Sequence, residues 1–206
     1  MIFFTYADIA SALHGETDRK TLAALQHVEV YRLLSDLYRH VYGKVLPPLK
    51  RGVEGKPYLA ASGAPHISLS HDGTLVGAVL SDCEIGLDIN RASRAASGRA
   101  CRRFFTGMKE SAILSPDEVT FTSASYREGA AYLPTPFLPL LAKEESDAAR
   151  YSRAEACLKL SGGGFADLPR LPAISAGAKV CSFLLPVREE TYAVSLAVFS
   201  DGKKKC

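Results

Sequence analysis

Hydrophobic residues along the chain follow two spacings, one typical of short strands and one typical of a long helix. Short apolar runs bounded by glycine, aspartate or charged residues predict a first strand that ends at Asp8 and a hairpin near the C-terminus. Three closely spaced runs predict three strands with tight connections in the middle of the chain. The runs after the first strand are 67–69, 75–80, 85–89, 180–187 and 192–199.

One stretch has the spacing of a long amphipathic helix. Thr17 or Asp18 is placed to cap its first turn, and Gly43 is placed to end it. The apolar residues that would share one face are Val30, Leu33, Leu34, Leu37 and Val41. We therefore expect a helix from about residue 18 to residue 42, with this face in the core.

The segment after residue 103 is harder to interpret. Residues 104–114 have the composition of a helix that Thr106 could cap. Residues 115–141 contain four prolines and show no sustained period, which predicts a long surface excursion with a short helix near 126–132.

A last helix is expected from about Glu144 to the glycines at 162–164. Ser152 and Glu155 have the spacing of a capping box, which predicts a break or a new start inside this helix. Glu155 and Lys159 lie one turn apart and could form a surface ion pair worth a few tenths of a kcal/mol. Both interpretations are purely structural.

Asp88 interrupts the most apolar of the three central strands. Because strand side chains alternate between faces, Asp88 lies opposite Leu87 and Ile89 and on the same face as Gly86 and Asn90. Burying a bare carboxylate is too costly, so Asp88 either faces solvent or is held by a cation or by hydrogen bonds. The strand pattern alone leaves both alternatives open.

Composition narrows the class of protein. The chain is 47% hydrophobic and 23% charged, which is typical of a soluble globular protein, and no apolar run approaches the roughly 20 residues that span a membrane. A net charge of +3 favours anionic partners only weakly and is not a nucleic-acid signature. The apolar N-terminus predicts a strand rather than a signal peptide. Five scattered cysteines argue against disulfides and zinc: Cys83, Cys101, Cys157, Cys181 and Cys206.

Five short motifs follow one another in the middle of the chain. They are Gly55-Lys56-Pro57, Ser68-Leu69-Ser70-His71, Gly86-Leu87-Asp88-Ile89-Asn90, Phe104-Phe105, and Tyr151-Ser152-Arg153-Ala154-Glu155-Ala156 with Lys159 and Gly162-Gly163-Gly164. In this order they resemble the phosphopantetheinyl transferase superfamily, of the type that activates surfactin synthetase. Each motif alone is weak, and the order of the five carries the resemblance.

The resemblance implies an α+β fold that consists of a pseudo-twofold pair of similar subdomains, residues 1–95 and 96–206, with the active site in the cleft between them. It also implies the activity of a holo-[acyl-carrier-protein] synthase. Such an enzyme uses magnesium to transfer the 4'-phosphopantetheine arm of coenzyme A to a serine hydroxyl of an apo acyl or peptidyl carrier protein, and it releases adenosine 3',5'-bisphosphate. A cytoplasmic monomer with no nucleic-acid partner is expected.

The resemblance also assigns the metal site and the catalytic residues. Asp88 and Glu155 match the magnesium ligands, and Asn90 stands at the position of a third ligand. Asp88, Glu155 and Lys159 are the catalytic candidates, with Glu155 as a base. The chemistry asks for these residue types, because magnesium prefers oxygen ligands and transfer from a pyrophosphate needs its charge neutralised.

Coenzyme A would be bound by residues from three of the motifs. Lys159 matches a lysine that contacts its phosphates, and His71 matches a histidine beside its 3'-phosphate. Lys56 matches a basic residue near the nucleotide, and Ser70 is a further candidate for phosphate. The carrier protein would dock after Lys159, where Phe165 and Leu168 could supply apolar contact.

Three departures from the family pattern define the alternatives. Asn90 replaces an acidic residue, Ala154 replaces a lysine, and Tyr151 replaces a tryptophan. They leave open a coenzyme A-binding protein of the same fold with weakened or lost transferase activity. A third possibility is a basic binding module that uses the arginines at 91–103.

Overall fold

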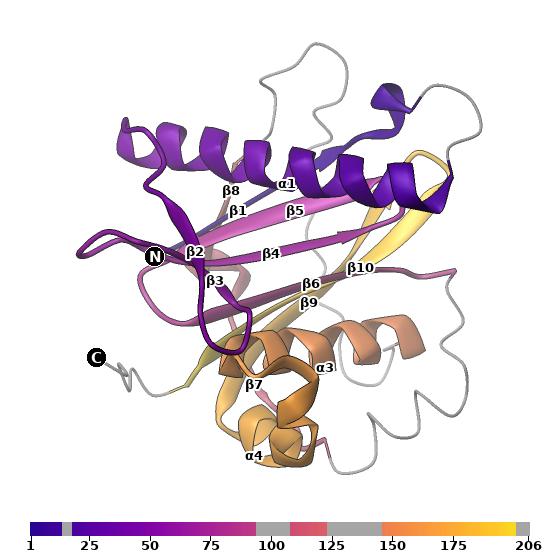
Figure 1. Cartoon of the computed structure of the whole chain (residues 1–206). Helices are drawn as coiled ribbons and strands as arrows, with labels where there is room; N and C mark the ends of the chain where they lie inside the picture. Colours follow the sequence, from indigo (N-terminus) through magenta and orange to yellow (C-terminus); the bar gives the residue numbers. More distant parts are fainter. Residues whose placement is uncertain (14–17, 94–107, 123–145, 201–206) are drawn as a thin grey trace.

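The computed structural model describes residues 1–13, 18–93, 108–122 and 146–200. They form a mixed α+β fold with two four-stranded sheets and a separate two-stranded sheet. Figure 1 shows the two larger sheets between two helices, with α1 on the outer side of one sheet and α3 on the outer side of the other. This arrangement agrees with the predicted α+β class.

The first sheet has the strand order β4-β5-β1-β8. Neighbours are antiparallel, except that β8 runs parallel to β1. The strands span Ile2–Asp8 (β1), His66–Asp72 (β4), Leu75–Ser81 (β5) and Val119–Phe121 (β8). Three of them confirm the strands predicted at the N-terminus and in the middle of the chain.

Helix α1, Arg19–Tyr42, covers the outer face of the first sheet (Figure 1). The Asp18 side chain accepts hydrogen bonds from the backbone N–H groups of Lys20 and Thr21, which caps the first turn. Gly43 ends the helix with a left-handed conformation at φ 65°. The predicted apolar face is confirmed: Val30, Leu33, Leu34 and Leu37 are buried, and Val41 is partly buried against them.

The second sheet has the order β6-β10-β9-β7. Its strands span Ile85–Arg91 (β6), Ala112–Ile113 (β7), Ala178–Val187 (β9) and Glu190–Phe199 (β10). The predicted C-terminal hairpin is confirmed by the antiparallel pairing of β9 and β10. Helix α3, Asp147–Ser161, packs on the outer face of this sheet. The inner faces of the two sheets form the largest apolar cluster, in which the rings of Phe4 and Phe183 meet edge to face at 6.0 Å.

The remaining elements are short. A two-stranded sheet joins β2, Leu49–Arg51, to β3, Pro57–Leu59. The other elements are α4, Leu171–Ala176, and three 3-10 helices, Ala10–Ala12 (η1), Pro116–Glu118 (η2) and Gly164–Arg170 (η3). Within the described ranges, no helix has both the length and the apolar content needed to cross a membrane.

The two large sheets meet where the edge of β4 faces the edge of β6. Among the described strands β6 pairs only with β10, so alternate N–H groups on its other side need partners. Side chains of β4 accept hydrogen bonds from three of them, and we call this row of contacts the seam. The pairs are Ser68 with Leu87 (3.0 Å), Ser70 with Ile89 (3.1 Å) and Asp72 with Arg91 (2.8 Å).

Two predictions about the segment after residue 103 were wrong. Met108 to Leu114 contains β7 and no helix, because residues 112 and 113 pair with β9. The predicted surface excursion begins with a 3-10 helix and β8, which pairs with β1 and buries Val119. The pairing of β7 with β9 and of β8 with β1 depends on distant residues, so the local sequence pattern of this proline-rich segment does not predict it. Residues 104–107 and 123–141, including the helix predicted near 126–132, lie outside the described residues.

The predicted break at Ser152 was also wrong. Helix α3 is continuous and is capped by Ser146, whose side chain accepts a hydrogen bond from the Ala149 N–H. The hydroxyl of Ser152 instead donates to the backbone carbonyl of Asp88. The division into halves at residue 95 stays a prediction, and the sheets do not follow it strictly: β6 belongs to the second sheet and β8 to the first.

Candidate functional site

Helix α3 approaches β6 unusually closely at Gly86. A Cβ atom at this position would lie 1.9 Å from the backbone oxygen of Ala156 and 2.6 Å from the nitrogen of Leu160. No side chain fits there, so only glycine allows the helix to rest on the strand. Asp88 is two residues further along the same face of β6 and therefore lies under α3.

Asp88 is almost fully buried, at 2% exposure, and is held by several groups. The ammonium of Lys159 donates to Oδ1 at 2.7 Å, and the Ser70 hydroxyl donates to the same oxygen at 3.3 Å. The side-chain amide of Asn90 donates to Oδ2 at 2.5 Å. Of the two alternatives that the sequence left open for Asp88, the structure therefore selects the held carboxylate.

Glu155 faces the same carboxylate from α3. Its side chain forms a hydrogen bond with Asp88, and the two acids are 67 positions apart in the sequence. Burial, followed by the negative charge of Asp88 and their mutual hydrogen bond, raises the pKa of Glu155 to about 7, although Lys159 and a hydrogen bond with Tyr151 act against this shift. The two carboxyl groups therefore lie close enough for the charge of one to disfavour ionisation of the other.

The donor atoms at this pair fit a hard divalent cation. Two carboxylates and the Asn90 amide offer oxygen ligands, and Lys159 balances only one of the two negative charges. The described part of the chain has no cluster of three histidine, cysteine or acidic side chains suited to a metal. Glu155, Asp88 and Asn90 are thus the residues that could hold a metal ion.

Ser70 and His71 lie at the end of β4 beside this pair. Ser70 accepts a hydrogen bond from Lys159 at 3.0 Å, besides its bond in the seam, so a single hydroxyl links β4, β6 and α3. His71 is exposed. Partial burial of its ring, and then the nearby Lys159 ammonium, lower the pKa of His71. No sequence motif predicted that His27, on α1, would lie near His71.

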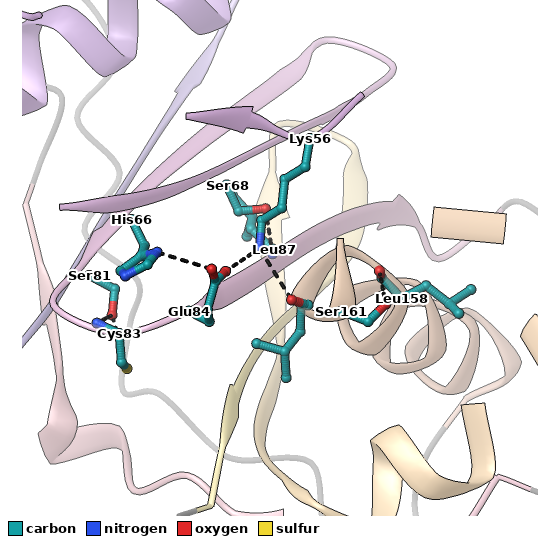
Figure 2. Close-up of polar contacts among 10 residues, drawn as sticks. Lys56, His66, Ser68, Ser81, Cys83, Glu84, Leu87, Leu158 and Ser161 are labelled. Atoms are coloured by element: carbon teal, nitrogen blue, oxygen red, sulfur yellow. Dashed lines mark hydrogen bonds and ion pairs between the residues drawn. The ribbon is translucent and has the colours of Figure 1, made fainter. Parts of the chain in front are cut away.

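Lys56 is not part of this cluster. Its ammonium donates to Glu84 Oε2 at 2.7 Å and to the backbone oxygen of Leu160 at 3.2 Å. Figure 2 shows Lys56 and His66 approaching Glu84 from two sides, and His66 Nδ1 lies 3.3 Å from Glu84 Oε1. A pocket of about 370 Å³ opens beside these side chains. Sequence reasoning missed Glu84, which lies in a turn and belongs to none of the motifs.

The remaining candidates have mixed surroundings. Ala154 is fully buried in the cluster between α3 and the second sheet, so a charged side chain has no room there. Phe165 is 64% exposed in η3, whereas Leu168 is partly buried. Arg91 lies 3.6 Å from Asp72, and residues 94–103 of the predicted basic segment lie outside the described ranges.

Comparisons with known proteins do not assign the chain to a family. No family model matches the chain, and no curated protein matches it significantly. The functional argument therefore depends on the chemistry of Asp88, Glu155 and Lys159 and on the order of the sequence motifs.

Proposed function

We propose that this protein is a magnesium-dependent phosphopantetheinyl transferase that modifies a serine of an apo carrier protein with the arm of coenzyme A. The observation that carries the proposal is the meeting of Asp88, Glu155 and Lys159, two acids and a cation that belong to a strand and a helix far apart in the sequence. The motif order independently assigns the same three residues to this reaction.

The site offers the groups that the transfer needs. The serine oxygen of the carrier forms a bond to the phosphorus that bears the pantetheine arm, and the pyrophosphate bond to adenosine 3',5'-bisphosphate breaks. Magnesium held by Asp88 and Glu155 would neutralise charge on the pyrophosphate oxygens. Glu155 lies beside Asp88 and would be the group that accepts the serine proton, directly or through water.

Lys159 and the end of β4 would orient the phosphates. The Lys159 side chain is 33% exposed, so its ammonium contacts Asp88 on one side and is accessible from solvent on the other. Ser70 lies within hydrogen-bond distance of it, and His71 is the next residue on the same strand. Together they would form a donor-rich edge for a phosphate group.

The wider arrangement belongs to the same proposal. The first sheet with α1 and the second sheet with α3 would be the two related halves, and the seam between β4 and β6 would form the floor of the cleft. The carrier would dock beside α3, where Phe165 presents an exposed ring. A cytoplasmic monomer is the expected state.

A second candidate is a coenzyme A-binding protein with weak or no transferase activity. Asn90 favours it, because its amide bonds to Asp88 and adds no negative charge for a metal. Weaker magnesium binding would follow from the missing carboxylate.

Incubation of the protein with coenzyme A, magnesium and an apo carrier tests both candidates. The first predicts a carrier whose mass increases by one phosphopantetheine arm, and loss of the product in Asp88→Ala and Glu155→Ala. Glu54→Gln, in an exposed turn, is the matched control and should stay active. Binding of coenzyme A without transfer at any magnesium concentration would select the second candidate, and unimpaired transfer by Asp88→Ala would refute the metal site.

A further inference from the structure

Lys56 and Glu84 bring three separate segments together. Lys56 follows the turn between β2 and β3, Glu84 lies in the turn between β5 and β6, and the Leu160 carbonyl belongs to the last turn of α3. The Lys56 side chain is 21% exposed and that of Glu84 is 36% exposed, so the pair is partly shielded from water.

The Lys56 ammonium contacts α3 at its C-terminal end, where backbone carbonyl groups lack partners within the helix. The last carbonyl groups of a helix have no N–H partner within it, and a positive charge at this end is favourable. Lys56 supplies both a donor and a charge to Leu160, and its stem is 3.7 Å from where a Cβ of Gly162 would lie. Glu84 orients the ammonium and balances its charge.

Two contacts then fix α3 along β6. The Ser152 hydroxyl donates to the Asp88 carbonyl at 3.1 Å, and Lys56 binds the Leu160 carbonyl at the other end. Glu155 and Lys159 lie between these two contacts. Lys159 is in the last turn, where a helix frays most readily without a partner.

We propose that the Lys56–Glu84 pair is a positioning latch that holds the last turn of α3, so that the Lys159 ammonium stays at Asp88. Its effect on transfer depends on the proposed function, whereas its effect on the helix does not. The latch departs from the role that the resemblance implies for Lys56. An ammonium paired with a carboxylate adds no net charge that would attract a nucleotide, and it acts on the site through Lys159.

Amide hydrogen exchange tests the latch without any assumption about activity. Lys56→Met and Glu84→Gln should each raise exchange in residues 158–161 by roughly threefold or more, and leave α1 unchanged. Lys56→Arg keeps a donor and a charge and should restore protection. Lys179→Met removes a lysine whose ammonium lies 3.9 Å from Glu118, an ion pair that does not involve α3, and is the matched control. Unchanged exchange in both Lys56→Met and Glu84→Gln overturns the latch.

Coenzyme A binding, measured by calorimetry, separates the latch from a direct contact. For a latch, Lys56→Met and Glu84→Gln each weaken binding by roughly three- to tenfold, and neither adds a loss in a Lys159→Met background. For a direct contact, Lys56→Met weakens binding in both backgrounds and Glu84→Gln strengthens it, because a competing anion is gone. That second pattern overturns the proposal. Absence of carrier transfer alongside a confirmed change in exchange would refute only the proposed function.

Discussion

The two long helices pack against their sheets in different ways. Helix α1 uses a row of large side chains, among them Leu33, Leu34 and Leu37. Helix α3 has mainly small buried residues over β6, such as Ser152 and Ala156, and it touches the strand at Gly86. Large side chains bury more apolar area and keep a helix at a distance, whereas small ones let polar groups of helix and strand meet. The first contact mainly stabilises the fold, whereas the second brings Asp88, Glu155 and Lys159 together.

Replacement of Gly86 by alanine should have the largest effect. The new Cβ would overlap the backbone of α3, so the helix must move away, at a cost of about 3 kcal/mol or more in the free energy of unfolding. Glu155 and Lys159 would move with it, and transfer should be lost. Chemical denaturation and the carrier assay measure the two effects. Gly177→Ala meets only ordinary contacts, the nearest at 3.5 Å, and should be close to neutral.

Truncation of Leu34 to alanine should affect stability alone. The Leu34 side chain of α1 is fully buried. Its truncation to alanine should lower the free energy of unfolding by about 3 kcal/mol. Transfer per folded molecule should stay unchanged below the unfolding temperature. Val28→Ala, 61% exposed on the same helix, is the control. If Leu34→Ala reduced transfer as strongly as Gly86→Ala does, the contrast between the helices would be wrong.

The pH dependence of stability tests whether Glu155 on α3 is held against Asp88 on β6. The pKa of Glu155 is raised from 4.5 to about 7 in the folded protein, so the folded state binds the proton more tightly than the unfolded state. The resulting stabilisation is fully present below pH 4.5 and is lost as the pH rises through about 7. Without magnesium, the stability of wild type relative to Glu155→Gln should therefore fall over this window, by on the order of 2 kcal/mol.

Denaturation midpoints of both proteins at a series of pH values measure this difference. Glu54→Gln, in an exposed turn, should show the same pH dependence as wild type. A difference that does not change with pH would mean that Glu155 is not held against Asp88.

The smallest predicted effect concerns Asn90. In Asn90→Glu a third carboxylate would lie next to Asp88, which should lower the magnesium concentration for half-maximal transfer by about tenfold. The same charge should destabilise the magnesium-free protein, because it would repel the carboxylates of Asp88 and Glu155. Asn90→Gln is the neutral control. An unchanged or higher magnesium requirement in Asn90→Glu would show that residue 90 does not face the metal.

Much of the fold could be predicted because local patterns carry it. The cap and apolar face of α1 and the three central strands follow from spacing and turn residues. The motif order alone predicted Asp88, Glu155 and Lys159 as site residues. Glu84, Gly86 and β8 could not be assigned, because their roles depend on partners distant in the sequence. Ser152 is the clearest example of this limit on sequence-based prediction. Its local pattern is that of a helix cap, but its hydroxyl instead forms a hydrogen bond with the Asp88 carbonyl, which is distant in the sequence.

The seam has a consequence for how the chain folds. Each of its three hydrogen bonds joins residues 19 positions apart, whereas β10 reaches β6 from the other end of the sequence. Closing short loops costs less chain entropy, so contacts of low sequence separation can form first. We expect residues 66–91 to act as an early nucleus, in which the edges of β4 and β6 join before α3 packs against β6.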